Sequence, residues 1–146
     1  MRSLNSANGL IMDLNLTFHH TGIACHDIVK TSAFYMAMGY TASPAVDDPI
    51  QHVRVAFLEK PGEPRLELLE PLDDQSPIKR TLESVGVSPY HICYKVKDIE
   101  ATIELLRQRR FLLVSGPVPA CAMDNRQVAF MFHKNTGLIE LVAFSS

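Results

Sequence analysis

The chain has few cysteines, almost no net charge and no N-terminal segment suited to a membrane. Its three cysteines, Cys25, Cys93 and Cys121, are odd in number and lack C-x-x-C spacing, so we expect reduced thiols in a cytoplasmic protein. Fourteen Lys and Arg against sixteen Asp and Glu give a net charge of −2, which offers no basic surface to nucleic acid or anionic lipid. Residues 1–13 contain one arginine and a short apolar patch, so we expect neither a signal peptide nor a membrane span. These features argue against a secreted disulfide scaffold, a nucleic-acid-binding protein and a membrane protein.

The sequence does contain an internal duplication. In two segments a histidine is followed seven and eight positions later by Asp-Ile, once from His20 and once from His91. Two further blocks recur at an offset of 73 residues: Arg54-Val-Ala-Phe-Leu matches Gln127-Val-Ala-Phe-Met, and Leu66-Glu67-Leu-Leu matches Ile139-Glu140-Leu-Val. A constant offset over separate blocks indicates two copies of one structural unit.

The hydrophobic pattern predicts the same element order in both halves. Strands are expected at residues 16–25, 53–59 and 65–69, with a weak strand at 40–43, and again at 90–96, 111–115, 127–132 and 138–144. Helices should follow the N-cap residues Asp27 and Asp98. A short helix over residues 76–85, ending at Gly86, should join the halves, and residues 116–126 should form an irregular loop.

The predicted fold class is therefore α+β, with two paired β-α-β-β-β modules whose curved sheets form a cleft. The expected organisation is a leader at residues 1–15, a first module at 16–72, a linker helix at 73–87 and a second module at 88–146. Exposed sheet edges in such modules favour a homodimer, because unpaired edges tend to be covered.

Each half contributes one histidine and one glutamate at matching places. A single glutamate on a strand most often points to solvent, and a single histidine is most often packed or solvated. Two copies related by a pseudo-twofold axis would instead bring His20, Glu67, His91 and Glu140 to one point. Two imidazoles and two carboxylates suit a divalent ion such as Zn, Ni, Co, Mn or Fe(II). The duplication thus predicts a metal site, with positions left open for a substrate oxygen.

These motifs resemble the vicinal oxygen chelate superfamily, which includes glyoxalase I, methylmalonyl-CoA epimerases, extradiol dioxygenases and antibiotic-resistance proteins. The resemblance covers residues 18–144 and lies in the His20-x-Gly-Ile-Ala start, the Glu67-Leu-Leu-Glu-Pro run, the His91-Ile strand and the Leu138-Ile-Glu-Leu end. It is strongest to the methylmalonyl-CoA epimerase family, on Leu68-Leu-Glu-Pro-Leu followed by Ser76-Pro-Ile. The resemblance implies the same four metal ligands, and the place of Glu67 is Gln in some epimerases.

An epimerase would need groups that remove and return a proton beside a carbonyl bound to the metal. We expect Glu140 to be both ligand and base, and His52 is the best candidate for a base outside the ligand set. Arg54 and Gln127, at equivalent places in the two copies, are predicted to face the cleft and bind a small-molecule substrate, with an acyl-CoA as the candidate. Arg54 is suited to binding a carboxylate. Surface positions for His52 and Arg54 are the competing interpretation.

Two features separate the chain from the epimerase pattern. Residues 120–126 replace a Gly-rich stretch, and Arg54 lies on the strand where some epimerases place a second carboxylate base. A glyoxalase I-like lactoylglutathione lyase, or another enzyme of the superfamily, is therefore an alternative. A small-molecule-sequestering resistance protein is a third, although such a protein would not need the four ligands.

Overall fold

A computed structural model describes residues 14–145, so most of the predicted leader lies outside the described residues. The elements are β1 (Thr17–Ala24), α1 (Ile28–Ala37), β2 (Thr41–Ala42), β3 (Val46–Asp48), β4 (Val53–Glu59), β5 (Leu66–Pro71), α2 (Ile78–Val85), β6 (Ser88–Val96), α3 (Ile99–Gln108), β7 (Leu112–Ala120), the 3-10 helix η1 (Cys121–Met123), β8 (Arg126–His133) and β9 (Gly137–Ala143). Among the described residues, none of the helices has the length and apolar character needed to cross a bilayer.

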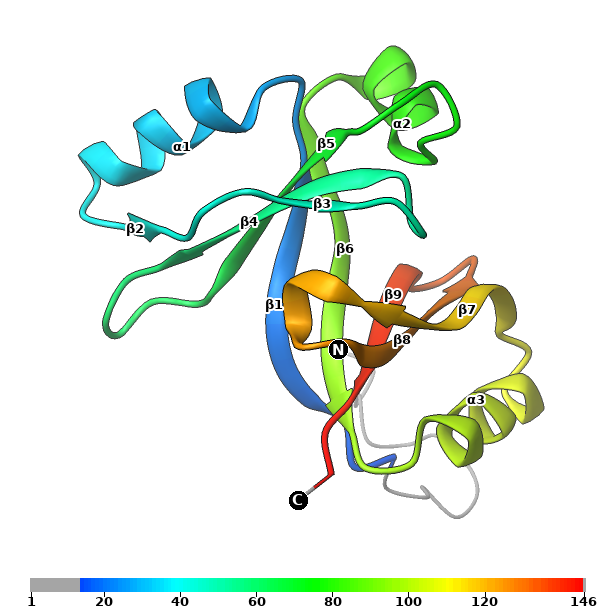
Figure 1. Cartoon of the computed structure of the whole chain (residues 1–146). Helices are drawn as coiled ribbons and strands as arrows, with labels where there is room; N and C mark the ends of the chain where they lie inside the picture. Colours follow the sequence, from blue (N-terminus) through cyan, green and yellow to red (C-terminus); the bar gives the residue numbers. More distant parts are fainter. Residues whose placement is uncertain (1–13, 146) are drawn as a thin grey trace, which may run out of the picture.

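The strands form one open mixed sheet in the order β2-β4-β5-β1-β6-β9-β8-β7, with β3 also paired to β4. Strands β1 and β6 pair antiparallel at the centre, and each pairs parallel with the last strand of its own half, β5 or β9. Figure 1 shows α1 with β2–β5 at one end of this central pair and α3 with β7–β9 at the other. Phe57 lies opposite Glu67, and Phe130 lies opposite Glu140, so the repeated blocks occupy equivalent positions. The predicted fold class is confirmed.

The two long helices begin as the sequence predicts. The Asp27 side chain accepts a hydrogen bond from the Lys30 backbone N–H, and the Asp98 side chain accepts one from the Ala101 N–H. Helix α1 covers a core with Ile23, Leu58 and Leu68. Helix α3 packs its own Ile103 and Leu106 against Met131 and Leu141. Each helix therefore packs on the same outer face of its own module.

The predicted loop over residues 116–126 is wrong in its first part. Strand β7 continues to Ala120, through Pro117 and Pro119, and two register shifts interrupt its pairing with β8. Proline is tolerated there because β7 is an edge strand, where a backbone N–H has no second neighbour to bond. Strand β3, which the sequence pattern missed, occupies the corresponding edge of the other half with β2.

Candidate metal centre

The four predicted ligands converge on one point. Their ligand atoms all lie within 4.8 Å of one another, and all four residues are buried. The Nε2 atom of His20 is 3.3 Å from Glu67 Oε1 and 3.2 Å from Glu140 Oε1. The Nε2 atom of His91 is 3.4 Å from both carboxylate oxygens and 3.1 Å from His20 Nε2. The central strands β1, β5, β6 and β9 each supply one ligand, which explains why the site depends on both halves.

Gly22 makes room for one of these ligands. It pairs with His91 across β1 and β6, and a Cβ atom at this position would lie 2.2 Å from the His91 ring. No other residue type can occupy this place without moving the imidazole. The glycine of the His20-x-Gly motif is therefore explained by a close approach between neighbouring strands.

The donor set fits a divalent cation. Glu67 Oε1 and Glu140 Oε1 are buried without a hydrogen-bond partner, which is costly for a carboxylate unless a cation compensates it. Burial opposes charge on His20 and His91, but the two carboxylates outweigh it and raise both histidine pKa values to about 9. The same histidines hold the pKa of Glu140 well below its usual range, although burial alone would raise it. A metal ion would replace the two imidazolium protons as the positive charge between the carboxylates.

His19 also belongs to the site, although strand alternation does not predict it. Strict alternation along a strand would turn His19 away from His20, but the β1–β6 register shifts between Phe18 and His20. As a result, His19 Nδ1 lies 2.7 Å from His20 Nδ1, and its Nε2 lies 3.0 Å from Arg65 Nη1. The only sequence signal was the doubled histidine itself.

The contact between His19 and His20 restricts the tautomers of both rings. A metal ion on His20 Nε2 would leave the proton on His20 Nδ1, which then donates to His19 Nδ1. His19 would carry its own proton on Nε2, so its close contact with Arg65 belongs to the other tautomer.

A second group of candidate ligands, His19, His20 and Cys93, is a poorer site. Burial, with a further contribution from Glu140, raises the pKa of the Cys93 thiol far above neutrality, so it carries no thiolate. The Nδ1 atom of His20 is also already hydrogen-bonded to His19. Of the two groups in the described part of the chain, the four-ligand cluster is therefore the better metal site.

The predicted substrate-binding residues are not brought to the cluster. Arg54 and Phe57 point to opposite faces of β4. Arg54 lies on the α1 face, where its Nε donates to Asp47 Oδ1 over 2.7 Å. Gln127 shares its strand face with Ala129 and Met131, which pack under α3. The cleft-facing residue beside Gln127 is Arg126. The substrate-binding role of Arg54 and Gln127 stays a prediction, without support from their positions.

His52 lies just before β4 with a positive φ of 58°, so its direction does not follow the strand alternation. Its Nδ1 is 2.9 Å from Asp73 Oδ2, and this contact lowers the pKa of Asp73. An aspartate on Nδ1 favours the tautomer that leaves Nε2 free to accept a proton. The proposed role of His52 as a base also stays a prediction.

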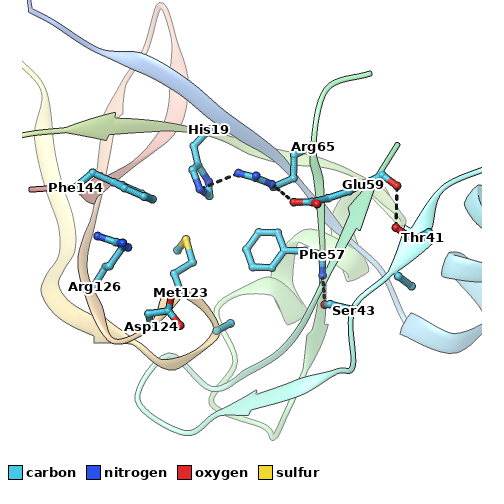
Figure 2. A pocket seen from close by; sticks show the side chains of 12 residues that line it. His19, Thr41, Ser43, Phe57, Glu59, Arg65, Met123, Asp124, Arg126 and Phe144 are labelled. Atoms are coloured by element: carbon cyan, nitrogen blue, oxygen red, sulfur yellow. Dashed lines mark hydrogen bonds and ion pairs between the residues drawn. The ribbon is translucent and has the colours of Figure 1, made fainter. Parts of the chain in front are cut away.

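Two cavities flank the cluster. One, of about 480 Å³, lies beside His20 and is lined by residues that include His19, Phe57, Arg65, Met123, Arg126 and Phe144 (Figure 2). The other, of about 330 Å³, lies beside His91 and is lined by residues that include His52, Val53, Tyr90, Val118, Phe130 and Leu138. Phe57 packs edge-to-face with His20 and Phe130 with His91, with ring centroids 5.4 and 5.1 Å apart. The two phenylalanines therefore line the cavities and also contact the ligand imidazoles.

Comparison with known proteins agrees with this architecture. Residues 19–130 match the family model of the glyoxalase/bleomycin resistance protein/dioxygenase superfamily. The chain is 32% identical to human mitochondrial methylmalonyl-CoA epimerase over 94% of its own length and 79% of that protein. It is also 32% identical to an ethylmalonyl-CoA/methylmalonyl-CoA epimerase of Cereibacter sphaeroides, over 84% of this chain and 94% of that one. A variant of Streptomyces coelicolor methylmalonyl-CoA epimerase in complex with 2-nitronate-propionyl-CoA superposes with a TM-score of 0.76 at 28% identity, covering 90% of this chain and 99% of that one.

Proposed function

Because the chain belongs to the glyoxalase/bleomycin resistance protein/dioxygenase superfamily, we propose that it is a metal-dependent epimerase acting on an acyl-CoA of the methylmalonyl-CoA type. Relatives named as methylmalonyl-CoA epimerases match nearly the whole chain and support an isomerase activity. The substrate class also follows these relatives, one of which is a complex with an acyl-CoA analogue.

The observation that carries the proposal is a pair of buried carboxylates in equivalent places. Glu67 Oε1 and Glu140 Oε1 approach the same two imidazoles from different halves, and neither accepts a hydrogen bond. Inverting a carbon centre requires a proton to leave one face and return to the other, which two symmetry-related carboxylates could provide. The protein thus has a candidate base on each side of the cluster.

Glu140 is ionised in the cluster. The histidines keep the pKa of Glu140 low, so its carboxylate carries no proton at neutral pH, and its basicity rises when the imidazolium protons leave. When bound, a divalent ion would act as a Lewis acid and favour the enolate formed from a thioester. Phe57 and Phe130 would help to keep water from the reacting carbon, because both pack apolar rings against the ligand imidazoles.

The deciding experiment is deuterium wash-in to (2R)- or (2S)-methylmalonyl-CoA in heavy water. The wild type should exchange the α-proton, and Glu140→Gln should lower the rate by about 10²–10⁴-fold while retaining part of the metal. An amide oxygen can still coordinate but cannot take up the proton, which is why the two effects should separate. No exchange by the wild type above a metal-free control would leave the proposal without support.

Glu67→Gln is the matched variant in the other half. Both changes remove one ligand charge, so a difference between them reports on the base. If Glu140 is the main base, Glu67→Gln should retain more exchange than Glu140→Gln. Exchange that survives fully in Glu140→Gln would move the base elsewhere. His52 would then be tested next by substitution with glutamine.

A further inference from the structure

The two cavities beside the cluster are counterparts under the internal duplication. Four lining positions of the larger cavity, His19, Phe57, Arg65 and Arg126, correspond to Tyr90, Phe130, Leu138 and Val53 at offsets of 71 or 73 residues. All four counterparts line the smaller cavity. The fold therefore presents two related hollows, one on each side of the four ligands.

The counterparts differ in charge. Two arginines and a histidine of the larger cavity are replaced in the smaller one by Leu, Val and Tyr. The larger cavity also contains two acidic residues. Glu59 is already bound by Arg65, whose Nε donates to Glu59 Oε1 over 2.6 Å, and Asp124 is exposed. The arginine left without a carboxylate is Arg126.

Arg126 is held in place by the ring of Phe144. Its guanidinium carbon lies 3.9 Å from the centroid of the Phe144 ring, which fixes one face of the planar group. Within residues 14–145, no carboxylate forms an ion pair with it. Figure 2 shows Arg126 and Arg65 on opposite sides of the cavity, with His19 between them. A stacked guanidinium keeps its edge N–H groups available for two parallel bonds to an anion.

We propose that this cavity is the subsite for an anionic group of the substrate, with Arg126 as its main binding residue. The subsite adjoins the cluster, because His19 contacts His20 directly and Phe57 lies against the His20 ring. The proposal rests on the proposed function, since an acyl-CoA of the malonyl type has anions at both ends, a carboxylate on the acyl group and phosphates on CoA. The apolar counterpart cavity lacks the arginines and would exclude such a group.

The test measures binding of acyl-CoAs to the wild type, Arg126→Gln and Arg126→Lys by titration calorimetry. If the anion is the acyl carboxylate, Arg126→Gln should weaken methylmalonyl-CoA by about tenfold or more and leave propionyl-CoA unchanged. If the anion is a CoA phosphate, both should weaken, whereas S-propionyl-pantetheine should not. Arg126→Lys keeps the charge but not the planar fork, so it should fall between the wild type and the glutamine variant.

Arg107→Gln is the matched control, because Arg107 is an exposed arginine on α3, and it should bind all ligands as the wild type does. Wild-type affinity in Arg126→Gln, or equal losses in Arg107→Gln, would overturn the subsite. If the wild type binds no acyl-CoA, the proposed function fails separately. Methylmalonate and inorganic phosphate then serve as probes. Weaker binding of either anion by Arg126→Gln supports the subsite, and no dependence on Arg126 overturns it.

Discussion

The two halves of the molecule supply the same pair of ligands but surround them differently. In the first half, His20 contacts His19, which in turn contacts Arg65. In the second half, the place of His19 is taken by Tyr90, and the Nδ1 atom of His91 has no hydrogen-bond partner in the described chain. His91 is instead packed against the rings of Tyr90 and Phe130. The polar support of the cluster therefore lies on one side only.

The strand backbone shows the same divergence. Gly22 faces His91 across the central pair, whereas the residue facing His20 is Cys93. Glycine allows the close approach of the imidazole, and a cysteine on the other side does not prevent His20 from reaching the cluster. Duplication thus conserves the position of the four ligands while the residues around them take on separate roles.

The largest effect is expected from removing a ligand. His20→Ala and His91→Ala should each lower metal affinity by at least an order of magnitude, since even the loss of a residue that only supports a ligand often costs this much. Metal analysis of the purified variants beside the wild type measures the effect. Stoichiometric metal in His91→Ala would contradict the assignment, and a loss in only one variant would show that the halves do not share the site equally.

Gly22→Ala should have the next largest effect, because its Cβ would clash with the His91 ring. We expect His91 to be displaced, with weaker metal binding and a lower melting temperature. Cys93→Ala, at the position facing His20, removes volume rather than adding it, so its metal affinity should be close to that of the wild type. Equal metal binding by Gly22→Ala and the wild type would show that the strands can move apart at no cost.

The fold and the four ligands were predictable because both depend on a repeated pattern. The caps Asp27 and Asp98, the strand blocks and the His/Glu pairs recur at nearly constant offsets, and symmetry then places the ligands together. The faces of Arg54 and Gln127 were not predictable in the same way. Side-chain alternation tells which residues of a strand share a face. It does not tell which face lies under a helix, and this is known only from the packing against α1 and α3.

The surroundings of the cluster depend on irregularities that leave little trace in sequence. The bulge in β1 turns His19 toward the cavity, and the bulged edge strand β7 leads to η1 and Arg126. A register shift of one residue exchanges the two faces of a strand, so a pattern without the shift assigns His19 to the wrong side. The residues that distinguish the two cavities were thus the hardest to identify.

Metal affinity should rise with pH. In the metal-free protein both cluster histidines have a pKa near 9, above the ordinary value of 6.5, so each must lose a proton before it can bind an ion. Titration against a competing chelator at pH 7, 8 and 9 should show an increase of roughly tenfold or more over this range. The metal-free protein should melt at a lower temperature as pH rises toward 9. The raised histidine pKa values stabilise the fold fully below pH 6.5, the ordinary histidine pKa, and this stabilisation is lost as pH rises through the folded-state pKa of about 9. A flat affinity would mean that the histidines are already neutral at pH 7.

The smallest predicted effect, and the sharpest comparison of the halves, comes from His19 and Tyr90. His19→Phe keeps a ring of similar size but removes the nitrogen beside His20 Nδ1, so His20 loses the partner that fixes its tautomer and orientation. We expect metal affinity to fall by about tenfold, the lower end of what such supporting contacts contribute. Tyr90→Phe changes the equivalent position by one hydroxyl group and should leave metal affinity unchanged, because Tyr90 contacts His91 through its ring.

Both variants should keep the far-ultraviolet circular dichroism of the wild type, which separates an effect on the ligand from a loss of fold. Equal affinities in His19→Phe and Tyr90→Phe would show that the polar chain on the His20 side does not support the metal, and its remaining role would be to hold Arg65 at the larger cavity.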